Sequence, residues 1–312
     1  MKKKKRYGDT VKDQLIASRR DRLYTFMMAR DTVRAVVVHG TRMVNEMRWN
    51  HQLGILETLV LGHGYLAAAL MSAGLKGGDR IGLQIECSGP IKGMSVEANA
   101  FGEVRGFLAQ VPIPIDQPLE SFDLTPFYGA GFLSVIKYPE DAKHPFTGRV
   151  MMEYGRLAKD LALYYLKSEQ IPTAVSLGVS FDKQGEVTGA GALLLQALPG
   201  AEDGVLAGLE EKMNDLGSMS EAVDQEGFPQ EWIREGFGEF RPRLLHQRGV
   251  EFMCHCNRKG IRTMMAMLKP DDLADMAANG PFPVEIRCHY CNTVFDFSRK
   301  ELLEIQKEAV DR

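Results

Sequence analysis

Apolar and polar residues alternate with a period of two in several short segments of the first 200 residues, a pattern that predicts β-strands. The clearest segment is 81–87, where apolar side chains fall on one face and Gln84 and Glu86 fall on the other. Similar β-rich segments occur at residues 33–38, 94–98, 104–111, 132–138, 174–179 and 192–198. These segments predict a β-rich domain.

Two longer apolar stretches, at residues 53–75 and 156–168, predict helices. The first is long enough to raise the question of a membrane span, but it contains Glu57 and His63. A charge in the middle of a span costs several kcal/mol in lipid, so we expect a buried helix and no membrane partner. Sheets packed with a few helices make an α+β fold the natural expectation.

Residues 201–250 differ from the rest of the chain, because Asp and Glu outnumber Lys and Arg there by more than two to one. Apolar residues at helical spacing predict one amphipathic helix over 205–216. Beyond it, glycines and prolines separate large apolar side chains, namely Phe228, Trp232, Ile233, Phe237 and Phe240. Glycine raises the ordering cost and proline breaks helices, so we expect a metastable segment that docks on a surface. An ordinary interdomain linker has the same composition.

The overall composition is that of a soluble globular protein, with 45% hydrophobic and 25% charged residues. A net charge of −3 argues against a protein that coats nucleic acid. The Lys-rich residues 2–6 are not followed by the apolar core of a signal peptide, so we expect a cytoplasmic protein. Five cysteines are too few for a disulfide-stapled secreted scaffold of this length.

Four of the five cysteines lie in the last fifth of the chain, in a CxC pair and a CxxC pair with 31 residues between them. They are Cys254, Cys256, Cys288 and Cys291. In a reducing compartment this pattern predicts a tetrahedral Zn²⁺ site with four thiolate ligands. His255 and His289 adjoin the ligands, but four thiolates complete the tetrahedron, so we expect both histidines outside the ligand set. Cys87 falls on the apolar face of its strand, as a small core residue does.

The sequence around the cysteines is typical of a small independent domain. Residues 270–272 combine a proline and two aspartates, which predicts a helix start. Segments 284–287 and 293–297 flank the CxxC pair as the strands of a hairpin do. Ser298 followed by Glu301 is a capping box that predicts the last helix.

A four-thiolate zinc site is compatible with more than one function. The zinc could be static, as in zinc ribbons that bind nucleic acid, although this tail has no basic excess and its first pair is CxC. Alternatively, peroxide or hypochlorous acid could oxidise the thiolates, and loss of the metal would then unfold so small a domain. A thiol oxidoreductase using Cys288 and Cys291 is disfavoured, because such an active site needs no second pair.

Six motifs occur in the order found in one known family. They are Gly89-Pro90 with Val104-Arg105-Gly106, then residues 129–135, 146–148 and 164–173, then 191–196 with Pro199, and the CxC and CxxC pairs with Tyr290 inside the second. From about Asp21 to about Lys300 the chain thus resembles the heat shock protein 33 family of redox-regulated 33 kDa chaperonins. It departs from the family at Ala192, where a second glycine is common, and at Asn257, where serine is usual.

The resemblance implies a chaperone that holds unfolding proteins without ATP and prevents their aggregation under oxidative and heat stress. It implies that the reduced, zinc-bound form is largely inactive, and that oxidation pairs Cys254 with Cys256 and Cys288 with Cys291. Zinc release would then unfold the tail and the linker, which bind client proteins, and the active form would be a homodimer. No phosphate-binding GxxxxGK[ST] motif occurs, and we expect neither a catalytic residue nor another cofactor.

Four regions are expected on these grounds. They are a basic N-terminal extension at 1–20, an α+β chaperone core at 21–200, an acidic linker at 201–250 and a zinc-binding redox-switch domain at 251–312. The alternative function is a zinc-ribbon protein that binds nucleic acid through a static structural zinc.

Overall fold

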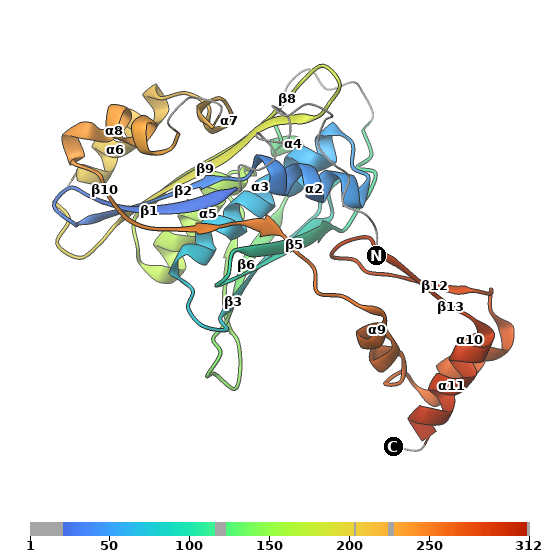
Figure 1. Cartoon of the computed structure of the whole chain (residues 1–312). Coiled ribbons are helices and arrows are strands. Elements are labelled where there is room, and N and C mark those ends of the chain that lie inside the picture. The colour runs from blue at the N-terminus through green and yellow to red at the C-terminus, as the bar shows by residue number, and fades with distance from the viewer. Residues whose placement is uncertain (1–20, 116–122, 203, 224–227, 311–312) are drawn as a thin grey trace, which may run out of the picture. The chain divides into compact units, whose positions relative to one another are not determined.

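The computed structural model describes residues 21–115, 123–202, 204–223 and 228–310, and the chain divides into two compact units, Met1–Met253 and Cys254–Arg312 (Figure 1). The expected N-terminal extension at 1–20 lies outside the described residues. The first unit begins with β1 (Arg22–Met28), β2 (Val33–His39), α2 (Thr41–His51), α3 (Ile55–Met71), η1 (Ser72–Gly74), β3 (Arg80–Cys87), β4 (Gly93–Asn99), β5 (Glu103–Leu108), α4 (Thr125–Tyr128), β6 (Gly131–Tyr138), β7 (Phe146–Met151), α5 (Leu157–Tyr164), η2 (Tyr165–Glu169), β8 (Thr173–Phe181) and β9 (Val187–Ala197). It ends with α6 (Val205–Asp215), α7 (Met219–Ala222), α8 (Gln230–Phe237), η3 (Gly238–Phe240), β10 (Arg243–Gly249) and β11 (Glu251–Phe252).

The first unit is built around two sheets with helix α3 between them. The five-stranded sheet has the order β10-β1-β2-β9-β8 and the six-stranded sheet the order β11-β5-β4-β3-β6-β7. All pairs are antiparallel except β11 with β5. Helix α3 packs in the main apolar core together with residues of both sheets. The stretch Ile55–Gly74 is long and apolar enough to cross a bilayer, but 89% of its most apolar window is buried inside the protein.

The α+β fold class expected from the sequence is confirmed, and β3 matches the alternating segment 81–87 closely. Strands β1, β7, β10 and β11 and helix α2 were missed. Strand β1 does not alternate because both of its faces are covered, so its residues are apolar on both sides. Strand β10 is mostly exposed, and its polar sequence therefore has no apolar face to detect.

The five-stranded sheet has two apolar faces. Val36 and Val38 of β2 point into the main core, whereas Val37 and the neighbouring Leu193 and Leu195 of β9 point to the opposite side. That opposite face is covered by α6, α7 and α8, which Figure 1 shows on the side of the sheet away from α3. The segment 201–250 that we expected to be a linker therefore packs on the first unit and contributes β10 to its sheet.

Three large apolar side chains of α8 are almost completely buried against that sheet face. They are Trp232, Ile233 and Phe237, with exposed fractions of 5%, 0% and 0%. Phe228 and Phe240 pack against the same cluster and are partly buried. The aromatic residues singled out in the sequence thus hold the segment to the sheet in this structure.

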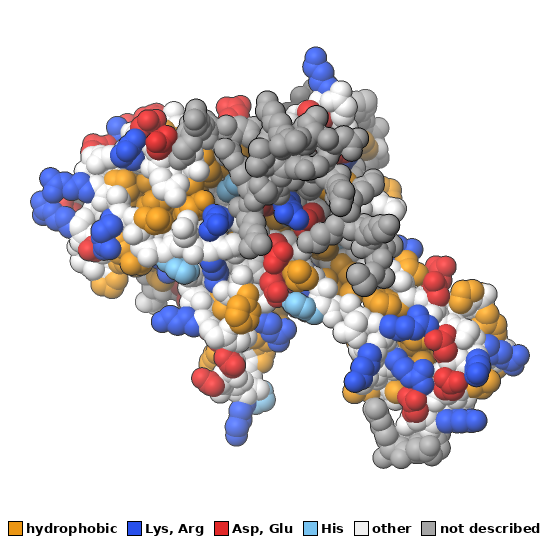
Figure 2. All heavy atoms as spheres, in the orientation of Figure 1, with side chains coloured by type: hydrophobic (Ala, Val, Ile, Leu, Met, Phe, Trp, Pro, Cys, Tyr) orange, Lys and Arg blue, Asp and Glu red, His pale blue; other side chains and the backbone are white. Residues whose placement is uncertain are grey.

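The second unit is small. It contains α9 (Arg258–Met265), α10 (Pro270–Asn279), β12 (Val284–Arg287), β13 (Val294–Phe297) and α11 (Arg299–Val310). The predicted helix start and hairpin are confirmed, and so is the capping box, because Ser298 donates from its backbone N–H (2.9 Å) and its hydroxyl (2.8 Å) to the Glu301 carboxylate. Its buried core consists of Ile261, Met265, Leu273, Ala277, Phe297, Leu302 and Ile305. On the face in Figure 2, acidic and basic side chains are interspersed over this unit.

Candidate metal centre

The CxC pair lies in the short segment between β11 and α9. Asn257, immediately after Cys256, is the N-cap of α9, and its side-chain Oδ1 accepts the backbone N–H of Gly260 at 2.9 Å. This cap determines where the helix begins, so Cys254 and Cys256 lie in the irregular segment just before it. Both cysteines are half-buried.

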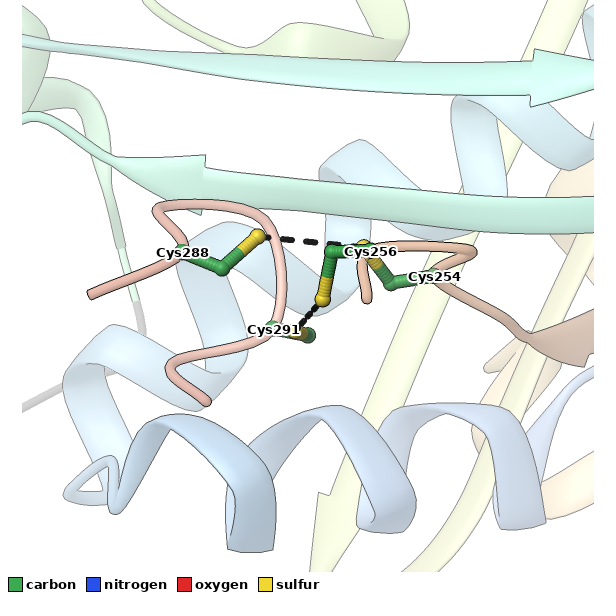
Figure 3. Close-up of side chains that lie close together, drawn as sticks. All are labelled: Cys254, Cys256, Cys288 and Cys291. Carbon is green, nitrogen blue, oxygen red and sulfur yellow. Dashed lines mark hydrogen bonds between the residues drawn. The ribbon is translucent and has the colours of Figure 1, made fainter. Parts of the chain in front are cut away.

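The CxxC pair lies in the turn that joins β12 to β13. The Cys288 N–H donates to the Thr293 carbonyl at 2.9 Å, and the Asn292 N–H donates to the Cys288 carbonyl at 2.8 Å. Asn292 adopts the left-handed conformation (φ 56°), which asparagine tolerates better than most residues. The tight turn brings Cys288 and Cys291 to one side of the hairpin end (Figure 3).

The four cysteine sulfurs converge, although the two pairs are far apart in the sequence. All four Sγ atoms lie within 4.8 Å of one another. The Cys254 and Cys288 sulfurs are 3.8 Å apart and those of Cys256 and Cys291 are 3.2 Å apart (Figure 3). A tetrahedral ion with Zn–S bonds of about 2.3 Å requires sulfur separations of about 3.8 Å. The cluster therefore has the size and the soft donor set to hold a metal ion, and it is compatible with zinc.

Protonation of the cluster is uneven. Hydrogen bonds from the Cys254 thiol and from Thr293 lower the pKa of Cys291 to about 4, against the opposing effect of burial. Burial together with Cys291 raises the pKa of Cys256 to about 12, and the hydrogen bond to Cys291 raises that of Cys254. A thiolate is thus favoured on Cys291 first, and a cation among the sulfurs would favour ionisation of the others.

The remaining sequence candidates lie outside this cluster. His255 and His289 have exposed side chains and are not among the clustered donors. Cys87 is half-buried in β3 and packs against the main core of the first unit. In the described part of the chain, no other group of three or more His, Cys, Asp or Glu side chains gathers as a possible metal site.

Two residues that support the centre were not found from the sequence. Thr293 Oγ1 lies 3.2 Å from the Cys291 sulfur, and Asn257 caps the helix that follows the CxC pair. Asn257 stands at a departure from the family resemblance, and the motif itself gave no hint of its capping role. Thr293 follows Cys291 by two residues, in the turn that ends where Arg287 pairs with Val294.

Helix α7 approaches the five-stranded sheet closely because the sheet residues beneath it are glycines. A side chain on Gly189 would overlap the carbonyl oxygen of Ser220, and one on Gly191 would overlap that of Met219. Gly189 and Gly191 alternate along β9, and two glycines at this spacing in a strand are a sequence signal for close approach of another segment. These glycines let the backbone of α7 lie directly against the backbone of β9.

The chain that leads to the cysteines is held to the first unit by backbone and side-chain contacts. Arg248 of β10 donates to the carbonyl oxygens of Ser72 and Ala100, and to the Ser72 hydroxyl at 2.7 Å. The Val250 N–H donates to the Asp21 carbonyl at 3.0 Å. The first unit therefore ends in an anchored strand and not in a loose tether.

Comparison with known proteins gives a consistent result. Over residues 21–298 the chain matches the sequence profile of a family described as Hsp33 protein. It is similar to a 33 kDa chaperonin of Agathobacter rectalis, at 33% identity over 88% of this chain and 95% of that protein. A 33 kDa chaperonin of Syntrophotalea carbinolica is 34% identical over 87% of this chain and 94% of its own. The crystal structure of a 33 kDa chaperonin (heat shock protein 33 homologue) from Thermotoga maritima matches with a TM-score of 0.85 at 32% identity, covering 94% of this chain and 100% of that one.

Proposed function

Because this chain belongs to the Hsp33 family, we propose that it is a redox-regulated, ATP-independent holdase that binds unfolding proteins and prevents their aggregation. Family membership supports the chaperone role itself. Activation by oxidation, through disulfide formation and zinc release under oxidative and heat stress, is the further content of the proposal.

The observation that supports the proposal most directly is the cluster of four cysteine sulfurs within 4.8 Å of one another. We propose that one Zn²⁺ is held there by Cys254, Cys256, Cys288 and Cys291 in the reduced state. When bound, the ion holds four thiolates together without redox chemistry of its own. A single core rarely stabilises a domain of about 60 residues strongly, so these four bonds would supply much of its folding free energy.

Oxidation would convert the cysteines in pairs. Each disulfide that forms takes two thiols, and one peroxide molecule accepts their two electrons and two protons to become two waters. The proposed pairs, Cys254 with Cys256 and Cys288 with Cys291, follow from the family resemblance. The shortest sulfur contacts in the structure join the two motifs instead, so the pairing has to be mapped. Either pairing removes the thiolates that would hold the metal.

Release of the α6–α8 segment would expose an apolar sheet face. The residues beneath it include Tyr24, Phe26, Val37, Leu193 and Leu195. Unfolding proteins expose apolar side chains of their own, and a large apolar patch is the kind of surface that binds them. The released segment would offer Trp232, Ile233 and Phe237 as further apolar contacts. We propose that this face and this segment together bind clients.

The charges of the second unit give little support to the alternative of a zinc ribbon that binds nucleic acid. Arg258 pairs with Glu301 at 2.6 Å, and Arg262 pairs with Glu308 at 2.6 Å. The two arginines of α9 are thus paired with acids on α11. A phosphate backbone needs several unpaired cations in one stripe, so a salt-dependent complex is not the expected outcome.

The proposal is tested on the reduced, zinc-loaded chain. Peroxide at heat-shock temperature should release about one zinc per chain to a chromogenic chelator and should form two disulfides, mapped by mass spectrometry. The oxidised protein should then suppress light scattering by thermally unfolding citrate synthase, without ATP. Cys87→Ser is the matched control, because this cysteine lies outside the cluster and its variant should respond as the wild type does.

Zinc that stays bound, together with unchanged aggregation of citrate synthase, would contradict the holdase proposal. A shift of duplex DNA by the reduced chain that weakens with salt would favour the zinc-ribbon alternative. We also propose a cytoplasmic location, where thiols are kept reduced, and a homodimer in the active state. Light scattering coupled to size exclusion should therefore give twice the monomer mass after oxidation.

A further inference from the structure

A cavity of about 310 Å³ opens in the first unit between its two sheets. Arg34 of β2 contributes from the five-stranded sheet, and Arg80 of β3 and Tyr138 of β6 contribute from the six-stranded sheet. Apolar side chains such as Met71 and Leu75 line one part of the wall, and Asp79, Lys137 and Glu169 line another. The volume is at the lower end of the ~300–1,000 Å³ typical of small-molecule sites.

Both acidic side chains of this cavity accept hydrogen bonds, but among the described residues only Glu169 is paired with a cation. The Asp79 carboxylate accepts the backbone N–H of Glu140 at 2.9 Å and that of Lys76 at 3.3 Å. The Glu169 carboxylate accepts from Lys137 at 2.6 Å and from the Tyr164 hydroxyl at 2.5 Å. These contacts also neutralise Lys137.

Two guanidinium groups remain without an anionic partner among the described residues. Arg34 donates to the neutral Gln196 side chain, and its enclosed Nε has no acceptor within hydrogen-bond distance in the described part of the chain. Arg80 stacks over the Tyr138 ring, 5.0 Å from its centroid, and forms no ion pair with any described carboxylate. Leaving the enclosed Arg34 Nε without an acceptor is costly, whereas Arg80 is exposed at the rim. A guanidinium fork matches phosphate and carboxylate oxygens.

One further side chain with a hydroxyl borders the same space. Tyr165 lines the cavity, and no described residue hydrogen-bonds to its hydroxyl. Burial raises the pKa of Tyr165, so the hydroxyl stays protonated and can donate. The rings of Tyr138 and Tyr165 provide flat apolar surfaces beside the two cationic groups.

We propose that this cavity binds a small phosphate monoester with a planar or apolar body, whose phosphate lies between Arg34 and Arg80. A phosphate monoester carries a charge of about −1.5 to −2 at pH 7, which matches two unpaired guanidinium groups better than one carboxylate does. The body of the ligand packs on Tyr138 and the neighbouring apolar side chains. This inference does not depend on the holdase activity, so the two proposals fail separately.

The test is isothermal titration of the reduced, zinc-loaded chain with phenyl phosphate. We expect one saturable site per chain, and Arg80→Gln should raise the dissociation constant at least tenfold. Arg80 is exposed, so its replacement leaves the packing intact. Arg149→Gln is the matched control, because Arg149 lies on the same sheet outside the cavity, where it pairs with Glu86. This control should bind phenyl phosphate as the wild type does.

Two more probes separate the parts of the proposal. Benzoate should bind at least tenfold more weakly than phenyl phosphate, because it carries a single charge. Inorganic phosphate should also bind more weakly, because it lacks the apolar body. The proposal is overturned if phenyl phosphate shows no saturable binding, if Arg149→Gln weakens it as much as Arg80→Gln does, or if either probe binds equally well.

Discussion

Two charged side chains, the buried Asp21 and the half-buried Arg248, lie where the chain leaves the first unit toward the cysteines. The Asp21 carboxylate is 3% exposed and accepts the N–H of Met43 at 2.7 Å, near the start of α2. The Arg248 guanidinium donates to the end of α3, at Ser72. Arg248 therefore connects β10, which the sequence pattern did not identify, to the predicted helix at residues 53–75, whereas Asp21 connects two parts of the chain that the pattern missed.

The first prediction concerns Arg248. Replacing it with methionine keeps the bulk of the side chain but removes the guanidinium donor from the Ala100 carbonyl and from Ser72, whose carbonyl keeps only the N–H of Leu75. We expect a loss of about 2–4 kcal/mol in the free energy of unfolding of the first unit, measured by urea denaturation. Arg243→Met is the control on the same strand, because its ion pair with Asp31 is exposed and should contribute less than about 1 kcal/mol. Equal losses for the two variants would contradict the interpretation that the Arg248 hydrogen bonds stabilise the first unit more than an exposed ion pair does.

The second prediction is a pH dependence that originates at Asp21. Burial raises the pKa of Asp21 to about 7, partly offset by hydrogen bonds from the backbone of Met43 and Arg42. The charges that face it are Arg42 and Glu46, with His39 Nδ1 4.0 Å away. Because the folded pKa exceeds the unfolded value near 4, the stability from this group is fully present below pH 4. It is lost as the pH rises through 7.

Asp21→Asn should remove that dependence. The free energy of unfolding of the variant relative to the wild type should increase between pH 4 and pH 7, by up to about 4 kcal/mol. Urea denaturation at a series of pH values measures this difference directly. A difference that stays constant across the range would show that Asp21 does not titrate in it.

Among the elements, the α6–α8 segment is held to the sheet by two kinds of contact. Trp232, Ile233 and Phe237 of α8 fill an apolar surface, and α7 lies against Gly189 and Gly191 of β9. The first contact is adaptable, because apolar side chains can repack. The second is not, because a backbone carbonyl occupies the position that a Cβ would take.

The third prediction follows from that close approach. Gly189→Ala should displace α7, lower the free energy of opening of the α6–α8 segment by about 1–3 kcal/mol and speed its cleavage in limited proteolysis. On the proposed mechanism, the reduced variant should also suppress citrate synthase aggregation without oxidant. Gly208→Ala in α6 is the control, since open space surrounds Gly208 and alanine favours a helix. Proteolysis of Gly189→Ala at the wild-type rate would contradict the packing argument.

At the scale of the whole molecule, the two units differ greatly in the size of their cores. The first buries residues from two sheets and α3, whereas the second has only a small group of buried apolar side chains around Phe297 and Leu302. A metal held by the four cysteines would therefore matter far more to the second unit than to the first.

The fourth prediction is that removal of the metal unfolds the second unit and leaves the first unit folded. A strong chelator should abolish hydrogen-exchange protection in α10 and α11, while β3 and β9 of the first unit keep theirs. Mass spectrometry of exchanged peptides measures both regions in one sample. Protection of α11 that persists after the metal is removed would contradict the proposed dependence of the second unit on it.

Much of the local structure was predictable, since the signals lie within a few residues of one another. The alternation in 81–87, the helix start at Pro270 and the capping box of Ser298 and Glu301 all depend on short spacings. Strand β1 was not predictable in the same way. Its residues are covered on two sides by layers that come from elsewhere in the chain.

The amino-acid sequence by itself determined the α+β class, most of the strands and the chemical nature of the cysteine motifs, because residue type and short-range periodicity express these properties. Tertiary structure alone decided that the four sulfurs meet within 4.8 Å, that α7 sits on two glycines and that Arg248 reaches Ser72. It also decided that Arg34 and Arg80 share a cavity. Each of these contacts joins residues far apart along the chain, and their distance in space depends on how whole layers pack.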